Sequence, residues 1–373
     1  MHSVTNSQKN FIFSLLAILV TGLIMVYSSS YIYGKEVFGS SLHFISKQLY
    51  FLVLGMGIAF IVWKSKISFW IKNANLFNLF AIFLLILTFV PNIGVSVKGA
   101  NRWLNLGVFT FQPGELIKYS LILASLKYFE GFLNLTITER FLHGFGMIFP
   151  LVLLVGQPDF GTFSICFLLM IFVCFLSSFP RKWFYTIFST GTLVGILVLF
   201  TQAYRVKRVL TFLDPWKNPK TSGFQIIQSY LAFANGSFFG QGLGNSTEKL
   251  FYLPEAHNDF IFSVIGEEVG FVGVVFVILA FLSFTYFGFK CALEIGEKIK
   301  TILVTSLVFT LSLQAALNMG VVLGLLPTKG LNLPFISYGG SSLVCNFFAI
   351  GLILSAMKHE KNWQGSGALG NKL

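Results

Sequence analysis

The sequence predicts an all-α integral membrane protein with about ten transmembrane helices. Hydrophobic residues make up 55% of its 373 residues and charged residues only 11%, whereas soluble domains carry about 25% charged residues. Ten apolar runs approach the roughly 17–25 residues that span a bilayer as a helix. The composition argues against a soluble enzyme, a nucleic-acid-binding protein and a disordered chain. The net charge of +12 is better explained by membrane topology and anionic lipid.

Eight of the apolar runs are clear and two are weaker. The clear runs cover residues 11–27, 49–63, 76–90, 163–179, 183–203, 260–288, 301–326 and 341–357. The weaker runs, 115–129 and 142–157, are also interpreted as spans, although the first contains Glu115, Lys118 and Lys127. The first clear run is interpreted as a retained helix rather than a signal peptide. It lacks a small-x-small cleavage site, and further spans follow.

Ten spans place both chain termini on the same side of the membrane. With the N-terminus inside, the cytoplasmic segments carry 14 Lys and Arg, and the four short outside loops carry 5. This asymmetry favours cytoplasmic termini. We therefore expect a cytoplasmic segment 1–10, a ten-helix membrane domain 11–357 and a cytoplasmic tail 358–373. A large extracytoplasmic loop, 204–259, separates the seventh and eighth spans, and we expect its six cations to meet an anionic ligand.

Three segments predicted on the outside face have features typical of functional loops. Segments 91–115 and 326–340 are rich in glycine and proline, and segment 204–259 is far longer than the usual connection. The functional site is therefore expected on this face. Within the large loop, apolar residues recur at helical spacing over 226–234, which predicts a short helix at the membrane interface.

Several acidic residues stand in or beside the spans. Glu115 and Lys118 are three residues apart, so a helix places them on one face, where they can pair. A structural ion pair and a lysine held toward a cavity are both open interpretations. Asp159 follows a Gln-Pro turn and is most simply the N-cap of the next helix.

Asp259 ends the large loop, directly before the helix predicted from Phe260. It is either an N-cap or a functional carboxylate. Glu267 and Glu268 lie two turns further on, and at 100° per residue at most one of them shares the face of Asp259. His257 is predicted to be a hydrogen-bonding residue rather than an acid–base catalyst.

Two groups of outside cations also have two interpretations. Arg102 precedes Trp103 in a glycine-rich loop, and Arg205 begins a basic cluster after the seventh span. Both groups either contact lipid headgroups or clamp a diphosphate. The four cysteines show no paired spacing, so neither a disulfide nor a zinc site is expected. No cofactor is predicted, and the sequence leaves a need for a divalent cation open.

Taken together, these motifs resemble the SEDS family of bacterial membrane proteins. The similarity runs through almost the whole chain in order and includes segments 98–107, 111–118, 157–162, 212–216, 240–246, 249–262, 265–268 and 326–342. Segments 253–257 and 327–330 look like the division branch of the family rather than the elongation branch, although a sporulation relative would share them. The chain departs from the family at Asn258, where Thr is usual, at Gly114, where Ser or Ala is common, and over 235–237.

The resemblance implies a peptidoglycan glycosyltransferase in the bacterial cytoplasmic membrane, at the division septum. Such an enzyme polymerises lipid II into a glycan strand and releases undecaprenyl diphosphate. It works with a class B penicillin-binding protein, other division proteins and membrane lipids, and no nucleic acid is implied. An elongation polymerase, a lipid II transporter and a non-catalytic division scaffold are the alternatives.

The resemblance also implies that Asp259 is the essential carboxylate. Our hypothesis is that Asp259 deprotonates the acceptor hydroxyl. The residues expected to bind the lipid diphosphate and sugar are Arg102, Trp103, Glu115, Lys118, Arg205 and Lys329. Among these, Glu115 would orient Lys118 and keep it charged, and Trp103 would offer a stacking surface. No metal ligand is predicted.

Overall fold

The structure of the chain is a computed structural model. The structure describes residues 5–97, 100–107, 109–201, 203–221, 223–247, 249, 256–328 and 330–358, without the side chains of 97 and 203–205. The long helices are α1 (Asn6–Phe38), α2 (His43–Lys64), α4 (Ala74–Leu87), α5 (Pro113–Gly131), α6 (Ile137–Gly156), α7 (Phe160–Leu176), α8 (Arg181–Phe200), α12 (Gly270–Glu294), α13 (Lys298–Val322) and α14 (Gly340–Ala356). The shorter helices are α3 (Ile67–Lys72), α9 (Ala203–Leu213), α10 (Phe224–Gly236) and α11 (Ile261–Glu268). Two 3-10 turns cover Phe132–Asn134 and Pro215–Lys217.

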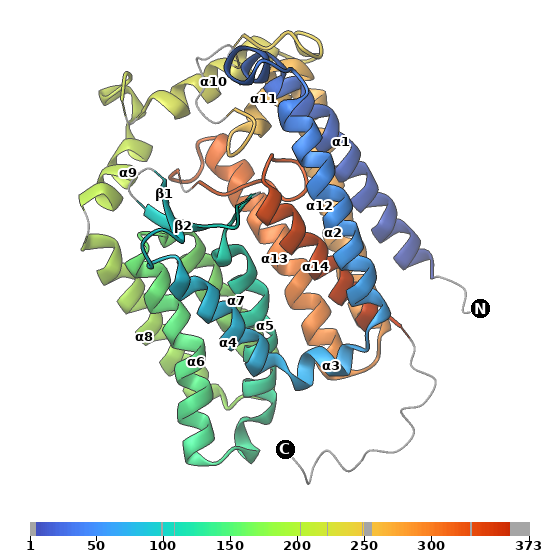
Figure 1. The fold of residues 1–373 in the computed structure, drawn as a ribbon, viewed down its shortest axis with the longest axis vertical. Coiled ribbons are helices and arrows are strands. Elements are labelled where there is room, and N and C mark those ends of the chain that lie inside the picture. The colour runs from blue at the N-terminus through green and yellow to red at the C-terminus, as the bar shows by residue number, and fades with distance from the viewer. Residues whose placement is uncertain are drawn as a thin grey trace. The chain divides into compact units, whose positions relative to one another are not determined.

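The predicted all-α, multi-span class is confirmed in the described part of the chain (Figure 1). Six helices are long and apolar enough to cross a membrane, and three shorter apolar helices, α4, α7 and α14, accompany them. Together with α5, which carries the buried charges, they correspond in order to the ten predicted spans. The short helix expected over 226–234 is α10.

Contacts within the chain divide it into two compact units. The first unit contains Met1–Leu54, Val194–Gly288 and Leu311–Asn346, and the second contains Gly55–Leu193, Phe289–Thr310 and Phe347–Leu373. Helices α2, α8, α12, α13 and α14 contribute residues to both units. The predicted large loop and Asp259 belong to the first unit, whereas Glu115 and Lys118 belong to the second.

The second unit is built around α5. This helix packs against α4, α6 and α7, which run alongside it in Figure 1. Most of its side chains are buried, including both charged residues of its first two turns. A small antiparallel sheet precedes it, in the order β1 (Gly94–Val97), β2 (Ala100–Asn105) and β3 (Thr110–Phe111). The sequence did not predict this sheet in the glycine-rich segment 91–115.

The first unit contains a break in the helix predicted over 260–288. The structure has two helices there, α11 and α12, which separate at Gly270 with φ +72°. A backbone break leaves amides and carbonyls that need new partners. Segment 237–242 supplies them: the amides of Gln241 and Gly242 donate to the carbonyls of Glu267 and Glu268 at 2.9 and 3.0 Å. In return, the amides of 271 and 272 donate to the carbonyls of 237 and 238.

Glycine permits this close approach of two backbones. A Cβ on Gly240 would lie 2.2 Å from the carbonyl oxygen of Glu268, and a Cβ on Gly270 would lie 2.3 Å from the amide nitrogen of Gly240. Both glycines also have positive φ angles, which side-chain-bearing residues rarely adopt. The predicted continuous helix is therefore wrong at Gly270, because the loop takes over its hydrogen bonds.

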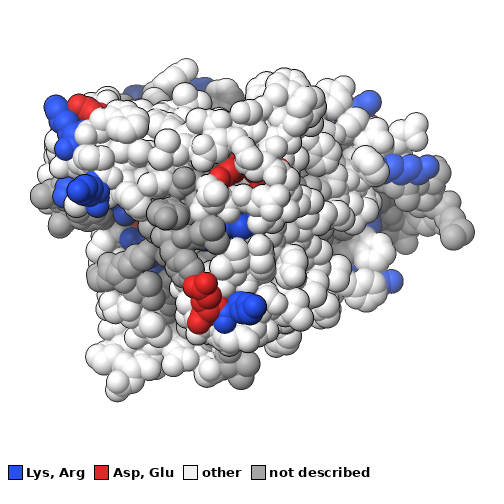
Figure 2. Space-filling view, turned by 90° about the horizontal axis from the view of Figure 1, so that it is seen from above, with Lys and Arg blue, Asp and Glu red and all other residues white. Residues whose placement is uncertain are grey.

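Uncharged residues dominate much of the exterior. In α8, no described side chain is buried, and in Figure 2 Lys, Arg, Asp and Glu occupy only small parts of the visible face. A helix that is apolar and exposed suits contact with lipid tails. All four cysteines, Cys166, Cys174, Cys291 and Cys345, are free and buried.

Candidate functional site

Asp259 lies in a turn whose backbone is held by three successive hydrogen bonds. The amide of Tyr338 donates to the carbonyl of His257 at 2.9 Å, and the Ser337 hydroxyl donates to the carbonyl of Asn258 at 2.7 Å. The side-chain amide of Asn318, on α13, donates to the carbonyl of Asp259 at 2.8 Å. All these residues belong to the first unit. Helix α13 and the segment after it therefore hold the backbone of residues 257–259.

The side chain of Asp259 is half-buried and lies beside Gly330. A Cβ on Gly330 would come within 3.2 Å of its Oδ2 atom, and Gly330 has φ +63°. The N-cap of α11 is Phe260, so the alternative prediction that Asp259 caps this helix is wrong. The helical offset expected between Asp259 and the two glutamates does not apply, because Asp259 precedes the helix.

His257 lies among aromatic rings. Its imidazole stacks on Tyr33 with ring centroids 5.7 Å apart, and it also contacts Phe44 at 4.6 Å and Tyr338 at 5.8 Å. Burial raises the pKa of the Tyr338 phenol, which therefore stays protonated at neutral pH. This environment favours a packing role for His257 over acid–base chemistry.

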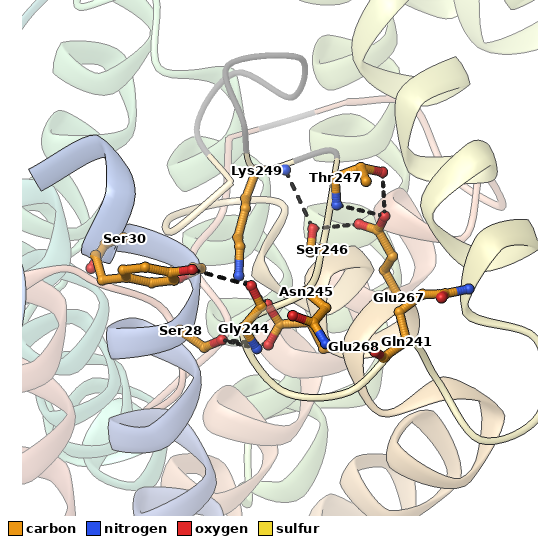
Figure 3. Close-up of polar contacts among 12 residues, drawn as sticks. Ser28, Ser30, Gln241, Gly244, Asn245, Ser246, Thr247, Lys249, Glu267 and Glu268 are labelled. Carbon is orange, nitrogen blue, oxygen red and sulfur yellow. Dashed lines mark hydrogen bonds and ion pairs between the residues drawn. The ribbon is translucent and has the colours of Figure 1, made fainter. Parts of the chain in front are cut away.

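Glu267 and Glu268 are fully buried and bind residues 246, 247 and 249 of the large loop (Figure 3). Glu267 accepts hydrogen bonds from the amide and hydroxyl of Thr247 at 2.9 and 2.8 Å, and from the hydroxyl of Ser246. Glu268 forms an ion pair with Lys249 at 2.6 Å and accepts a hydrogen bond from Ser28 of α1. We call these six residues the glutamate anchor. No role was predicted for Lys249 from the sequence, and neither were the contacts of this anchor.

The glutamate anchor is completed by neighbouring backbone and aromatic groups. The amide of Gly244 donates to the Ser28 hydroxyl at 3.1 Å, and the Tyr31 hydroxyl donates to the Gly244 carbonyl at 3.2 Å. The Lys249 ammonium also lies 4.9 Å from the centroid of the Tyr31 ring. Two adjacent glutamates in an apolar helix signal a need for buried partners, but the spacing alone does not say which residues supply them.

The second unit gathers several other predicted residues. Lys118 and Glu115 form a buried ion pair at 2.8 Å, as their spacing predicted. Asp159 is the N-cap of α7 and accepts hydrogen bonds from the amide and hydroxyl of Thr162 at 3.2 and 2.8 Å, which confirms the simpler prediction. Its Oδ2 atom would lie 3.9 Å from a Cβ on Gly114, the residue before Glu115.

Arg102 lies on β2, and its side chain reaches the turn before α7. Its guanidinium donates to the carbonyl of Pro158, and its buried Nε atom has no hydrogen-bond partner within the described structure. A buried donor without a partner is unusual and suits a ligand acceptor. The structure therefore brings Arg102, Asp159 and the Glu115–Lys118 pair to neighbouring parts of β2, α5 and α7.

The remaining predicted ligands are less fully described. Trp103 is half-buried on β2, opposite Val95 of β1. Lys329 lies outside the described residues, as does the side chain of Arg205. Arg208, in the same basic cluster, donates to the carbonyl of Thr328 at 3.3 Å. Among the described residues, no group of three or more His, Cys, Asp or Glu side chains is arranged to hold a metal ion.

Comparison with known proteins gives consistent matches over nearly the whole chain. A family model for FtsW, RodA and SpoVE, described as "Cell cycle protein", matches residues 8–362. A protein of Buchnera aphidicola subsp. Schizaphis graminum is 41% identical over 88% of this chain and 95% of its own. A protein of Thioalkalivibrio sulfidiphilus is 40% identical over 91% of this chain and 87% of its own. Each is named "Probable peptidoglycan glycosyltransferase FtsW".

Solved structures agree with these matches. A chain from a study titled "Structural coordination of polymerization and crosslinking by a peptidoglycan synthase complex" has a TM-score of 0.73 and 30% identity, covering 93% of this chain and 96% of that one. The rod shape determining protein RodA of Thermus thermophilus has a TM-score of 0.67 and 26% identity, covering 93% of this chain and 95% of its own. With its apolar helices, this chain is thus a multi-pass membrane protein. The resemblance of its motifs to the SEDS family is confirmed, and the chain belongs to the FtsW/RodA/SpoVE family of cell cycle proteins.

Proposed function

We propose that this chain is a peptidoglycan glycosyltransferase that polymerises lipid II during septal cell-wall synthesis, with Asp259 as its catalytic base. Relatives about 40% identical over most of the chain carry the glycosyltransferase name. One observation carries the assignment of Asp259: its backbone is fixed by Asn318 from α13 while its half-buried carboxylate lies beside Gly330. A catalytic base needs this combination of fixed position and access to its substrate.

The proposed reaction is an inverting glycosyl transfer. The Asp259 carboxylate takes the proton of the acceptor 4-hydroxyl, and that oxygen attacks the anomeric carbon of the donor sugar. A new carbon–oxygen bond forms while the bond between the anomeric carbon and the phosphate oxygen breaks, and undecaprenyl diphosphate leaves with the electron pair. Attack opposite the leaving group converts an α-linked donor into a β-linked product. Because diphosphate leaves readily once its charge is neutralised, no second carboxyl is needed as general acid.

Cations complete the proposed site. Arg102, Arg205 and Lys329 would bind the diphosphate, as would Lys118, which Glu115 orients at 2.8 Å. The unpartnered Nε of Arg102 supports its role, since a phosphate oxygen would satisfy it. Trp103 would pack against the sugar or the lipid. These roles rest on the chemistry and local contacts of each residue.

The partners and topology are also proposed. The structural match to a chain of a complex that couples polymerisation and crosslinking supports pairing with a crosslinking enzyme, a class B penicillin-binding protein. The likeness to relatives named FtsW supports a septal location, and the cation asymmetry of the loops supports cytoplasmic termini, 1–10 and 358–373. Residues 1–4 and 359–373 lie outside the described part of the chain.

Transport of lipid II is the second candidate function. The observation that favours it is the Glu115–Lys118 pair, whose side chains are only 11% and 2% exposed in a mostly buried helix. Buried charges of this kind often mark translocation paths. A transporter needs no catalytic base, however, so Asp259 separates the two functions.

The test is polymerisation of purified lipid II in detergent, with and without the crosslinking partner. We expect glycan strands from the native chain and none from Asp259→Asn, with both proteins equally folded by size-exclusion chromatography. Asp214→Asn is the matched control, because Asp214 is an exposed acid of the same loop that contacts Lys217 at 3.8 Å. Strand synthesis by folded Asp259→Asn would overturn the assignment. Lipid II movement across vesicles without any strand synthesis would favour the transporter.

A further inference from the structure

We propose that Asn318 and Ser337 are positioning residues for Asp259, and that together they fasten the turn 257–259 to the segment 331–333 beside the catalytic carboxylate. This inference rests on the proposed function, since it concerns the same reaction. Neither side chain touches the reacting atoms in this proposal, and each acts through the backbone that it binds. All of these residues belong to the first unit and to the described part of the chain.

The side chain of Asn318 reaches both the turn and the segment. It is buried near the end of α13, and its amide group donates to the carbonyl of Asp259 at 2.8 Å and to the carbonyl of Leu331. Leu331 directly follows Gly330, and a Cβ on Gly330 would come within 3.2 Å of the Oδ2 atom of Asp259. One amide group thus holds the backbone of the catalytic residue and the backbone next to its carboxylate at a fixed separation.

The side chain of Ser337 forms a second bridge, one residue earlier in the turn. Its buried hydroxyl donates to the carbonyl of Asn258 at 2.7 Å and accepts a hydrogen bond from the amide of Leu333 at 2.8 Å. Between Leu333 and Ser337, Phe335 has φ +64°, a conformation that side-chain-bearing residues rarely adopt and that surrounding contacts must maintain. The two bridges therefore attach the turn to a segment whose own backbone is held in one conformation.

Stability alone does not explain Asn318. Its Oδ1 atom is buried and has no hydrogen-bond partner within the described residues. A buried acceptor without a partner lowers stability, and such a group in a native structure calls for an explanation. A leucine would fill a similar volume without burying this acceptor. The two carbonyls that the amide group binds, at Asp259 and Leu331, supply the explanation.

A positioning role predicts a separation between turnover and substrate binding. Without the bridges, the carboxylate and the residues proposed to bind the diphosphate are all still present, so lipid II should still bind. Turnover is more sensitive, because a displacement of about 1 Å in a catalytic group can cost about 100-fold in rate. A loss of stability alone would instead reduce the amount of folded protein and leave its kcat unchanged.

The experiment measures kcat and KM for lipid II in the detergent polymerisation assay, with the crosslinking partner present. Asn318→Leu has a similar volume and lacks both donors, and Ser337→Ala lacks the hydroxyl. For folded protein, we expect kcat to fall about 10–100-fold in Asn318→Leu. It should fall by a smaller factor in Ser337→Ala, which keeps the Asn318 bridge. KM should stay close to native in both variants.

Asn78→Leu is the matched control. Asn78 is also a buried asparagine, on α4 in the second unit, and its side-chain amide donates to the backbone carbonyl of Gly146 at 2.8 Å. The thermal midpoint of Asn78→Leu in detergent should fall about as far as that of Asn318→Leu, since each variant loses buried amide hydrogen bonds. Its kcat should stay native, so the comparison separates the position of Asp259 from stability.

The possible outcomes separate the positioning role from the proposed function. A folded Asn318→Leu with native kcat overturns the positioning role, as does an effect confined to KM or an equal loss of kcat in Asn78→Leu. Should Asn318→Leu fail to fold, Ser337→Ala decides: native kcat overturns the role, and lowered kcat with native KM supports it. Absence of strands from the native chain, or strands from Asp259→Asn, would instead reject the proposed function, so the two failures are distinguishable.

Discussion

Two buried lysine–glutamate pairs in the described part of the chain have similar chemistry and different connectivity. Lys118 and Glu115 are 2% and 11% exposed and lie three residues apart on α5. Lys249 and Glu268 are 1% and 0% exposed and lie nineteen residues apart, joining a loop to α11. The Lys118–Glu115 pair lies within one helix, so it joins no distant segments and orients only its own two side chains. The second pair attaches a loop residue to a helix distant in sequence, so burial and charge alone do not define the role of an ion pair.

The largest expected effect is a loss of stability when Lys249 is replaced. Lys249→Met leaves the fully buried Glu268 carboxylate without a cation, and breaking a buried pair in this way costs about 3–5 kcal/mol. Unfolding in detergent, followed by circular dichroism, measures this loss. Lys217→Met, at an exposed residue of the same loop, should leave stability unchanged. A native unfolding curve for Lys249→Met would remove the distinction between the pairs.

Removal of Lys118 should lower stability less than removal of Lys249 does, but it should weaken the binding of lipid II. Lys118→Ala leaves Glu115 in the first turn of α5, where the helix N-terminus offsets up to about 2 kcal/mol of the cost. We expect loss of polymerisation together with weaker lipid II binding, measured by direct titration of the purified protein. Native binding and turnover in Lys118→Ala would make this pair purely structural.

The smallest effect is expected at Asp159, which lies near the Lys118–Glu115 pair and caps only its own helix, α7. Asp159→Ala removes the cap of α7 and should lower stability by about 1 kcal/mol. Asp159→Asn keeps an acceptor for the Thr162 amide and should restore most of it. Both should keep polymerising lipid II in the detergent assay. A folded but inactive Asp159→Asn would show that the carboxylate serves the reaction.

Local sequence rules predicted the features that depend on neighbouring residues. The apolar runs gave the membrane helices, the helical spacing over 226–234 gave α10, and the three-residue spacing gave the Glu115–Lys118 pair. Asp159 was predicted as a cap because the residues around it form a turn before an apolar run. Each of these features is set within one or two helical turns of chain.

Features that depend on distant segments were not predicted. The break at Gly270 exists because segment 237–242 supplies hydrogen bonds from about thirty residues away in sequence, within an apolar run that otherwise reads as continuous. The β1–β2–β3 sheet forms from short strands with little periodicity, in a segment rich in glycine and proline. The partner of Glu268 could not be inferred either, since no spacing rule connects a loop lysine to a helix glutamate.

The break between α11 and α12 has a consequence for how the large loop exchanges with solvent. The amides of Gln241, Gly242, Phe271 and Val272 are all donors in the hydrogen bonds that bridge the break. Amides of long loops usually exchange rapidly with deuterium, whereas bonded amides wait for local opening. Slow exchange at these four positions would therefore report how often the loop and the helix separate.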